Sequence, residues 1–386
     1  MQNYLIIKSC RLYNSPDKDA LYDINVSNNK IQRIERTSEK NKCENLIYAE
    51  GGIASPGFID VHIQGAGGAD VLDNKMESLE AISKTLAKVG TTAYLGTTVV
   101  KPEEGNQHLK LMRQCVNKDL GGATLLGVHL EGPFINIKKK GGLAEDSIYE
   151  PTLEGLESIF EATGDSLKMM TIAPELPGNI EIIKHLVKHK VVASFAHSDA
   201  DYEETKKGFE AGINHVTHIF NAMRSLHHRT PGPLAAIFEN NNISVQIISD
   251  GHHLHPSIVN IIYELIGGKR CICITDGMHG IGLPDGYYMY NGRKYESKKG
   301  AARYLDGTLI GSTMSLGNIA LNFMEFTGCT FETAINSVTK NPAKLLNIYN
   351  EKGSLDLGKD ADIVLFDKDN SIFTTLVNGK IVYQKK

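Results

Sequence analysis

The sequence predicts an α/β protein made of a (β/α)8 TIM barrel and a small β-sandwich domain built jointly by both ends of the chain. Two observations indicate this architecture. Between about residues 59 and 275, apolar segments of strand length alternate with segments of helical periodicity, which is typical of a barrel of parallel strands. On either side of this region, apolar and polar residues alternate as they do in exposed antiparallel strands.

The elements follow in order along the chain. Residues 4–13 and 20–36 are predicted as antiparallel strands, with a turn at Asn28 and Asn29. Eight barrel strands are expected at 59–63, 92–98, 123–131, 169–173, 191–197, 215–220, 243–249 and 271–275. Helices are expected between them, near 78–89, 103–116, 153–162, 179–189, 201–211, 233–239 and 256–266.

The chain after the last barrel strand breaks this repeat. Residues 280–311, rich in Gly, Tyr and Lys, predict either a β-hairpin or a lid. Two helical patterns follow near 314–327 and 331–346, the second punctuated by Asn341-Pro342, and short strands are expected over 353–367 and 372–384. We therefore expect a small β domain from residues 1–54 and 354–386, and a catalytic barrel domain over residues 55–353.

Composition excludes several classes of function. The net charge of −4 gives no basic footprint for nucleic acid or for an anionic membrane, so neither is an expected partner. The N-terminal apolar run is too short for a signal peptide, and no stretch is long enough to span a bilayer. The six cysteines are scattered and show no disulfide spacing. We therefore expect a cytoplasmic globular protein.

Side chains capable of chemistry follow several of the predicted barrel strands. Glu131 ends the third strand, and His62, His197, His218 and Asp276 stand after the first, fifth, sixth and eighth. These strand ends form the active site in barrels of this class. A buried Glu131 alone would be explained equally well by a salt bridge or by a metal. Two histidines and one glutamate at the same barrel mouth, with a coordination position left open, favour a catalytic zinc site.

Short motifs run in order through essentially the whole chain. They are Pro-Gly-Phe-Ile-Asp-Val-His-Ile at 56–63, His-Leu-Glu-Gly-Pro-Phe at 129–134, Ala-His-Ser-Asp at 196–199, His-Val-Thr-His-Ile-Phe-Asn-Ala-Met at 215–223, Asp-Gly-His-His-Leu-His-Pro at 250–256, Thr-Asp-Gly at 275–277, Leu-Pro-Asp-Gly at 283–286 and Leu-Ile-Gly-Ser at 309–312. In this set the sequence resembles the N-acetylglucosamine-6-phosphate deacetylases of the amidohydrolase superfamily.

The resemblance implies a barrel of the metal-dependent hydrolase type that converts N-acetylglucosamine 6-phosphate to glucosamine 6-phosphate and acetate, in amino-sugar catabolism. Glu131, His197 and His218 match the family's metal ligands, and Asp276 matches its general acid/base. The implied cofactor is a divalent metal, one ion per chain, with Zn²⁺ as the first expectation and Fe²⁺, Mn²⁺ or Co²⁺ as alternatives. Such a metal would activate water and polarise the amide carbonyl.

The resemblance also implies how an amino-sugar phosphate is bound. The phosphate is expected against Arg229 and His253, and Asn221 and Ala222 match positions that hold the sugar and phosphate. The planar guanidinium of an arginine suits phosphate because it can contact two oxygens at once. In relatives the matching arginine reaches into the neighbouring subunit, so the resemblance implies a homodimer in which Arg229 completes the neighbour's site.

Two positions depart from the family pattern. Members with two metals usually carry His-x-His after the first strand, whereas this chain has His62-Ile63-Gln64, and an amide is a poorer zinc ligand than imidazole. We therefore expect one metal, with His62 either lining the site or weakly holding a second ion. Leu143 stands where relatives have a histidine that polarises the substrate carbonyl. Losing such a donor can cost about 2.7–4 kcal/mol of transition-state stabilisation, so either another group supplies it, the substrate differs, or turnover is slow.

Three functions are consistent with these residues. The first is deacetylation of N-acetylglucosamine 6-phosphate. The second is the same chemistry on another N-acyl amino-sugar phosphate, such as N-acetylgalactosamine 6-phosphate, or on another amide. The third is a non-catalytic protein that binds sugar phosphates, and it is disfavoured because binding alone does not require Asp276.

Overall fold

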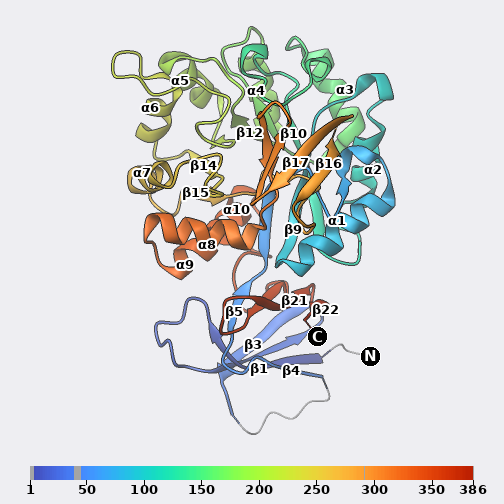
Figure 1. The fold of residues 1–386 in the computed structure, drawn as a ribbon, viewed down its shortest axis with the longest axis vertical. Coiled ribbons are helices and arrows are strands. Elements are labelled where there is room, and N and C mark those ends of the chain that lie inside the picture. The colour runs from blue at the N-terminus through green and yellow to red at the C-terminus, as the bar shows by residue number, and fades with distance from the viewer. Residues whose placement is uncertain (1–3, 39–44, 291, 386) are drawn as a thin grey trace.

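A barrel of parallel strands forms the larger part of the molecule, and a sheet from both chain ends lies beside it (Figure 1). The structure, a computed structural model, describes residues 4–38, 45–290 and 292–385. Within these residues, eight strands pair in the order in which they follow one another along the chain. They are β6 (Phe58–Ile63), β9 (Thr91–Thr98), β10 (Thr124–Glu131), β11 (Leu167–Ile172), β12 (Val192–Phe195), β13 (His215–Val216), β14 (Ser244–Ile247) and β15 (Cys271–Cys273).

Backbone contacts between the first and last strands close the barrel. Ile63 forms a parallel bridge with Gly277, and the Asp276 N–H donates to the carbonyl of His62 over 3.0 Å. Every residue of β6, β9 and β10 is buried, because a parallel strand is covered on both faces. The closure brings the residues that follow β6 next to those that follow β15. The predicted barrel class is confirmed.

Helices surround the barrel (Figure 1). They are α1 (Met76–Lys88), α2 (Gln107–Cys115), α3 (Leu153–Thr163), α4 (Asn179–Lys188), α5 (Tyr202–Ala211), α6 (Gly232–Glu239), α7 (Pro256–Ile266) and α8 (Leu316–Thr327). Their positions follow from local sequence signals. In α1, for example, the buried residues Leu79, Ile82 and Leu86 recur at helical spacing. At the start of α5, Asp201 and Glu204 form a reciprocal capping box, which satisfies backbone N–H groups of the first turn.

The predicted helix over 331–346 is divided in the structure. It consists of α9 (Phe331–Val338) and α10 (Lys340–Leu345), and the backbone leaves helical geometry at Thr339, with φ −132° and ψ −77°. Pro342 explains the position of the break, since its ring conflicts with the carbonyl four residues earlier, that of Val338. The break therefore precedes the Asn341-Pro342 dipeptide rather than falling on it.

The insertion forms an antiparallel sheet, so the hairpin alternative describes its fold. Its strands, in order, are β16 (Gly286–Tyr290), β17 (Arg293–Lys298), β18 (Ala301–Tyr304) and β19 (Leu309–Ser312). Met278, Tyr295, Ala302 and Tyr304 form a separate small apolar cluster beneath it. A backbone bridge between Gly277 and Ser312 joins this sheet to the barrel rim.

Strands from both chain ends form a second sheet, as predicted. Its order is β22, β21, β20, β5, β1, β2, β3, and β4 also pairs with β1. The strands are β1 (Tyr4–Leu12), β2 (Tyr22–Ser27), β3 (Lys30–Arg36), β4 (Leu46–Tyr48), β5 (Ile53–Pro56), β20 (Ile363–Phe366), β21 (Ile372–Val377) and β22 (Lys380–Gln384). Only Gly57 separates β5 from the first barrel strand, so the expected boundary between residues 54 and 55 falls inside β5. We propose the division into a terminal unit and a barrel unit on the basis of these two sheets.

The segment 353–362, predicted to contain short strands, forms turns instead. Gly353 and Gly358 have φ values of 86° and 81°, a conformation that interrupts a strand and favours glycine. The remaining short elements lie in loops of the barrel: β7 (Gly65–Ala66), β8 (Ala69–Asp70), η1 (Val71–Asp73), η2 (Pro102–Glu104), η3 (Ile137–Lys139), η4 (Glu145–Ser147) and η5 (Gly164–Ser166).

Two further sequence features concern the whole chain. In the part of the chain that the structure describes, no helix is long and apolar enough to cross a bilayer. The five cysteines in that part are free, and Cys43 lies outside the described residues.

Candidate metal centre and catalytic pocket

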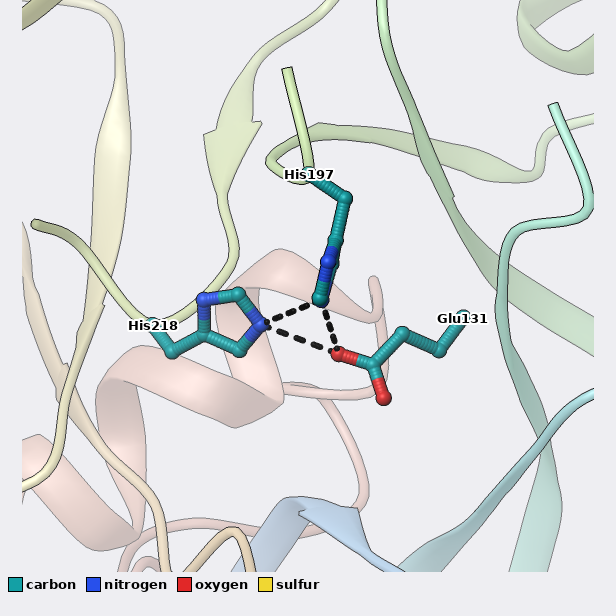
Figure 2. A group of neighbouring side chains, drawn as sticks. All are labelled: Glu131, His197 and His218. Atoms are coloured by element: carbon teal, nitrogen blue, oxygen red, sulfur yellow. Dashed lines mark hydrogen bonds and ion pairs between the residues drawn. The ribbon is translucent and has the colours of Figure 1, made fainter. Parts of the chain in front are cut away.

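Three side chains meet at the carboxyl ends of the barrel strands. Glu131 is the last residue of β10, and His197 and His218 each stand two residues beyond the end of their strand, β12 or β13. The Oε1 atom of Glu131 lies 3.0 Å from Nε2 of His197 and 2.9 Å from Nε2 of His218. The two imidazole Nε2 atoms are 3.1 Å apart, so one atom from each residue points to a common centre (Figure 2).

This donor set fits a divalent metal ion. All three ligand atoms lie within 4.8 Å of one another, and all three residues are buried. Nitrogen and oxygen ligands about 2.0–2.1 Å from a tetrahedral zinc ion lie about 3.3 Å from one another, close to the separations seen here. The Nδ1 atom of His197 donates to the carbonyl of Lys139 over 2.7 Å, which leaves Nε2 of the neutral ring free to bind a metal. The group can therefore hold a metal ion with little adjustment.

The backbone is strained at three of the predicted site residues. His197, His218 and Asp276 have φ values of 47°, 28° and 49°, in the left-handed region that residues with a Cβ rarely adopt. Such conformations cost stability and concentrate at functional sites, where the surrounding structure holds them. All three side chains line the same pocket.

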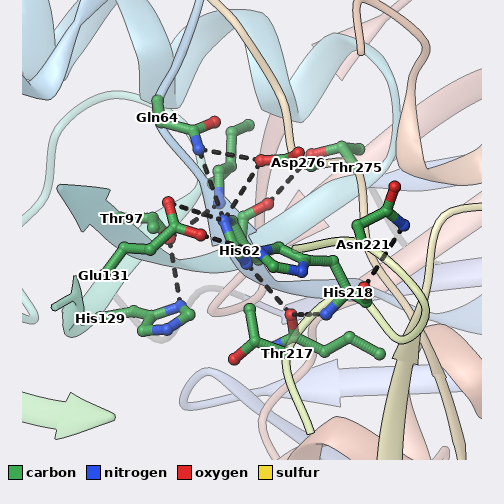
Figure 3. A network of polar contacts seen from close by, with 12 residues as sticks. His62, Gln64, Thr97, His129, Glu131, Thr217, His218, Asn221, Thr275 and Asp276 are labelled. Carbon is green, nitrogen blue, oxygen red and sulfur yellow. Dashed lines mark hydrogen bonds and ion pairs between the residues drawn. The ribbon is translucent and has the colours of Figure 1, made fainter. Parts of the chain in front are cut away.

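Asp276 lies beside the triad, where Gln64 and His62 contact it (Figure 3). Its Oδ1 accepts a hydrogen bond from Nε2 of Gln64 over 2.9 Å and lies 3.2 Å from Nε2 of His62. Its Oδ2 lies 3.5 Å from Nε2 of His253. Burial raises the pKa of Asp276, but His62 and His253 lower it further, so that the net pKa is well below its usual value. The side chain is thus a carboxylate at neutral pH.

His62 lies between the carboxylates of Asp276 and Glu131. Its Nε2 is 3.8 Å from Oε2 of Glu131, and its Nδ1 lies 3.0 Å from Oε1 of Gln246. Burial alone would lower the pKa of His62, but the charges of Glu131 and Asp276 raise it well above the usual value. The same surroundings act on Glu131: burial raises its pKa, and the charge of His62 with hydrogen bonds from the histidines lowers it well below the usual value.

His253 contacts two carboxylates. Its Nδ1 donates to Oδ2 of Asp250 over 2.6 Å, while Nε2 faces Asp276. Burial lowers the pKa of His253, and the hydrogen bonds with Asp250 and Asp276 raise it to about 9. A cationic imidazole therefore stands at the edge of the pocket.

The remaining predicted substrate-binding residues differ in where they lie. Asn221, Ala222 and His253 line the pocket that contains the triad and Asp276, and Leu143 lines it too. Arg229 does not line this pocket but lies exposed on the loop before α6. Within one chain, the structure therefore brings all the predicted site residues together except Arg229.

Sequence reasoning missed two buried polar residues of the site. Gln246 lies in the middle of β14, where its Oε1 accepts from His62 and from the His218 backbone N–H over 3.3 Å. Asp60 lies in β6, where its Oδ2 accepts from the hydroxyl of Thr275 over 2.6 Å. Both residues interrupt otherwise apolar strands, and this interruption was the available signal.

The model of the amidohydrolase family matches residues 53–382, which is most of the chain. The chain belongs to the amidohydrolase family. An N-acetylglucosamine-6-phosphate deacetylase of Bacillus subtilis is 34% identical over 369 residues, which cover 94% of this chain and 93% of the relative.

Two further members of the amidohydrolase family are informative. An N-acetylgalactosamine-6-phosphate deacetylase of Escherichia coli O157:H7 is 32% identical over 84% of this chain and 86% of the relative. The crystal structure of an N-acetylglucosamine-6-phosphate deacetylase of Thermotoga maritima superposes with a TM-score of 0.85 at 30% identity, covering 99% of this chain and 100% of that chain. The resemblance drawn from the sequence motifs is confirmed, and so is the barrel with its terminal sheet.

Proposed function

We propose that this chain is a metal-dependent deacetylase that hydrolyses the acetamide of N-acetylglucosamine 6-phosphate to glucosamine 6-phosphate and acetate. The observation that supports it most strongly is the placement of a proton-accepting carboxylate, Asp276, beside a Glu-His-His triad in one buried pocket. Relatives of matching length from several organisms carry the name of this activity.

The metal is proposed to be one divalent ion per chain, held by Glu131, His197 and His218. Zinc is favoured because two imidazoles and one carboxylate, with a fourth position open, are the ligands of catalytic zinc sites, and Fe²⁺, Mn²⁺ or Co²⁺ are alternatives. When bound, the metal supplies Lewis acidity that activates a water molecule and polarises the acetamide carbonyl. His62 lines the site through its contacts with Asp276 and Gln246.

Asp276 carries out both proton transfers, and neighbouring residues hold it in place. Asp276 accepts a proton from the attacking water as the new carbon–oxygen bond forms, and it passes that proton to the amine nitrogen as the carbon–nitrogen bond breaks. Gln64 and His62 hold Oδ1 of Asp276 in place, which leaves Oδ2 facing His253. The strained backbone of Asp276 fixes the direction in which the carboxylate is presented.

The substrate phosphate is proposed to bind at the side of the pocket formed by Asn221, Ala222 and His253. The positive charge of His253 attracts the phosphate, and Arg229 of a second subunit supplies a further cation. Arg229 is exposed in its own chain and lies outside its own pocket, which leaves it free to serve a neighbour. We therefore propose a homodimer with shared sites.

A second substrate is supported by one relative. The deacetylase of Escherichia coli O157:H7, 32% identical to this chain, is named for N-acetylgalactosamine 6-phosphate, which differs from the glucose form in configuration at one carbon. The epimer is therefore the main alternative substrate. Acetate release from both 6-phosphates, and from an unphosphorylated N-acetylhexosamine as control, tests the proposal. No acetate release by metal-replete protein from either phosphate would overturn it.

A further inference from the structure

Asp70 is a buried carboxylate with one oxygen unused. Its Oδ1 accepts the backbone N–H of Leu72 over 2.9 Å and caps η1. Only 7% of the residue is exposed, and its buried Oδ2 has no hydrogen-bond partner among the described residues. Buried carboxylate oxygens are normally hydrogen-bonded, because leaving one unsatisfied costs stability. We therefore expect Oδ2 to accept a hydrogen bond from a bound molecule, since no described residue donates one.

Tyr290 presents a hydroxyl that is also unused. It ends β16 of the inserted sheet, and its ring stacks on His279 with centroids 6.1 Å apart and planes at 30°. The hydroxyl makes no hydrogen bond to the described residues. Burial raises the pKa of Tyr290 well above its usual value, and the charge of Asp70 is the next largest cause.

Both residues border the pocket that contains the triad and Asp276. Asp70, Leu72 and Tyr290 line this pocket, and the same three residues also line a second pocket. Neither Asp70 nor Tyr290 makes a hydrogen bond to the triad or to Asp276. The two groups therefore belong to the wall that faces the substrate rather than to the metal centre.

The chemistry of the pair selects one kind of ligand group. A carboxylate oxygen accepts a hydrogen bond and repels phosphate, whereas a phenol with no partner can donate one. A hydroxyl satisfies both, since it donates to the carboxylate and accepts from the phenol. The acyl methyl group satisfies neither. Such a pair thus fits an alcohol of a sugar ring.

We propose that Asp70 and Tyr290 form a subsite that binds one ring hydroxyl of the amino-sugar substrate, with Asp70 accepting and Tyr290 donating. The inference rests on the proposed function for the identity of the substrate. It assigns to this chain two substrate-recognition residues from different parts of the fold, one in the loop after β6 and one in the inserted sheet.

The test compares the parent substrate with its 1-, 3- and 4-deoxy analogues. Burial raises the pKa of Asp70 to about 7, so the assays are run above that pH, where the carboxylate predominates. Asp70→Asn keeps the oxygen that caps η1 and replaces the unused acceptor with an amide donor. It should lower kcat/KM for the parent substrate by roughly tenfold or more, mainly through KM, as expected for loss of a charged hydrogen bond. For the one analogue that lacks the bound hydroxyl, the variant and the wild type should be equal, and Tyr290→Phe should behave in the same way on the same analogue.

Asp73→Asn is the matched control. Asp73 lies in the same turn and borders the second pocket but not the one that contains the triad, and its Oδ2 accepts from the Asp70 N–H and the Ser78 hydroxyl. This variant should lower the melting temperature and leave discrimination among the analogues unchanged. Melting temperatures of the two other variants check that they are folded.

The outcomes separate the subsite from the function. Acetate release by the wild type, with equal losses for Asp70→Asn on the parent and on every analogue, overturns the subsite alone. A fall in kcat for Tyr290→Phe on every analogue, with KM unchanged, would mean that the phenol acts on the acetamide and would also overturn the subsite. No acetate release from any hexosamine 6-phosphate by the wild type overturns the proposed function, and the subsite with it.

Discussion

The Oε1 atom of Gln246 lies 3.0 Å from Nδ1 of His62, and this contact requires a hydrogen on that nitrogen. Gln246 Oε1 also accepts the backbone N–H of His218 over 3.3 Å, so two donors face the same atom and identify it as the carbonyl oxygen. His62 must therefore carry a hydrogen on Nδ1, and its Nε2 is directed at Asp276. Gln246, which lies outside the substrate pocket, thus orients His62, which lies against the proposed base Asp276.

Replacing this amide should impair turnover without removing the metal. Gln246→Leu removes the acceptor for Nδ1 and should lower kcat about 10–100-fold, as is usual when a supporting partner of a metal site is lost. Gln246→Glu keeps an acceptor at the same place and should retain much more activity. If both variants lose activity equally while keeping the metal, the hydrogen bond from His62 to residue 246 does not support turnover.

The metal should depend on the triad. Protein purified without added metal should contain about one divalent ion per chain, and His218→Ala should lose both the ion and the activity, because two ligands do not hold a catalytic zinc site. Elemental analysis measures the ion directly. His215→Ala is a suitable control, since His215 is a buried histidine of β13, the strand that precedes His218, and it bonds to Ser244 instead. Two tightly retained ions per wild-type chain would contradict the single-metal proposal.

Asp276→Asn should separate metal binding from proton transfer. The amide fits the same space and can still accept from Gln64, so the fold and the metal content should persist. Turnover should fall by several orders of magnitude, because an amide does not carry a proton from water to the amine. Metal content and acetate release are measured on the same preparation. Near-normal turnover would assign the base to another residue.

Arg229 should act on the neighbouring subunit. Arg229→Ala should raise KM for a phosphorylated substrate far more than for an unphosphorylated one. Mixing this variant with Asp276→Asn gives heterodimers in which one site has both defects and the other has neither, so part of the activity should return. If Arg229 served its own chain, every mixed site would keep one defect. Proven subunit exchange without recovery would therefore reject shared sites.

Lys352 should stabilise the junction between the barrel and the terminal sheet. Its Nζ lies 2.7 Å from Oδ2 of Asp362 and 2.8 Å from Oδ2 of Asp360, and the Lys352 side chain is 7% exposed. Lys352→Met leaves the two carboxylates without this partner and should lower the free energy of unfolding by about 3–5 kcal/mol at neutral pH. Lys380→Met is the control, because the pair of Lys380 with Asp119 is exposed and its loss should change stability little. Denaturant unfolding of both variants measures the difference.

The pH dependence of this effect follows from the shifted groups. Burial raises the pKa of Asp360, but Lys30 and Lys352 lower it below the usual value, so its contribution is present above the unfolded pKa, about 3.9, and is lost as pH falls through the folded value. Burial lowers the pKa of Lys352, but Asp362 and Asp360 raise it above its ordinary value, so its contribution is lost only as pH rises through that folded value. The difference in the free energy of unfolding between wild type and Lys352→Met should therefore become smaller at strongly acidic and at strongly alkaline pH. A constant difference between strongly acidic and neutral pH would show that packing, not charge, causes it.

Much of the site could be predicted because barrel strands end at a shared rim. Once β10, β12 and β13 were placed by their apolar periodicity, Glu131, His197 and His218 had to meet. The contact between Gln246 and His62 could not be predicted in this way, because it depends on which face of β14 points inward. The position of Tyr290 depends on the register of an antiparallel sheet inserted into the repeat, which the barrel pattern does not determine. The proposed role of Arg229 depends on a second copy of the chain, whose position the barrel pattern of one chain does not determine.

The pairing of β5 with β20 has a consequence for how the protein is made. Residues 53–56 leave the ribosome long before their partner, residues 363–366, has been synthesised. Until then, the strand joined through Gly57 to the start of the barrel keeps an unpaired edge, of the kind that recruits other chains. The growing chain is therefore exposed to aggregation at this edge until β20 has been made, and loss of the chain from β20 onward would make that state permanent.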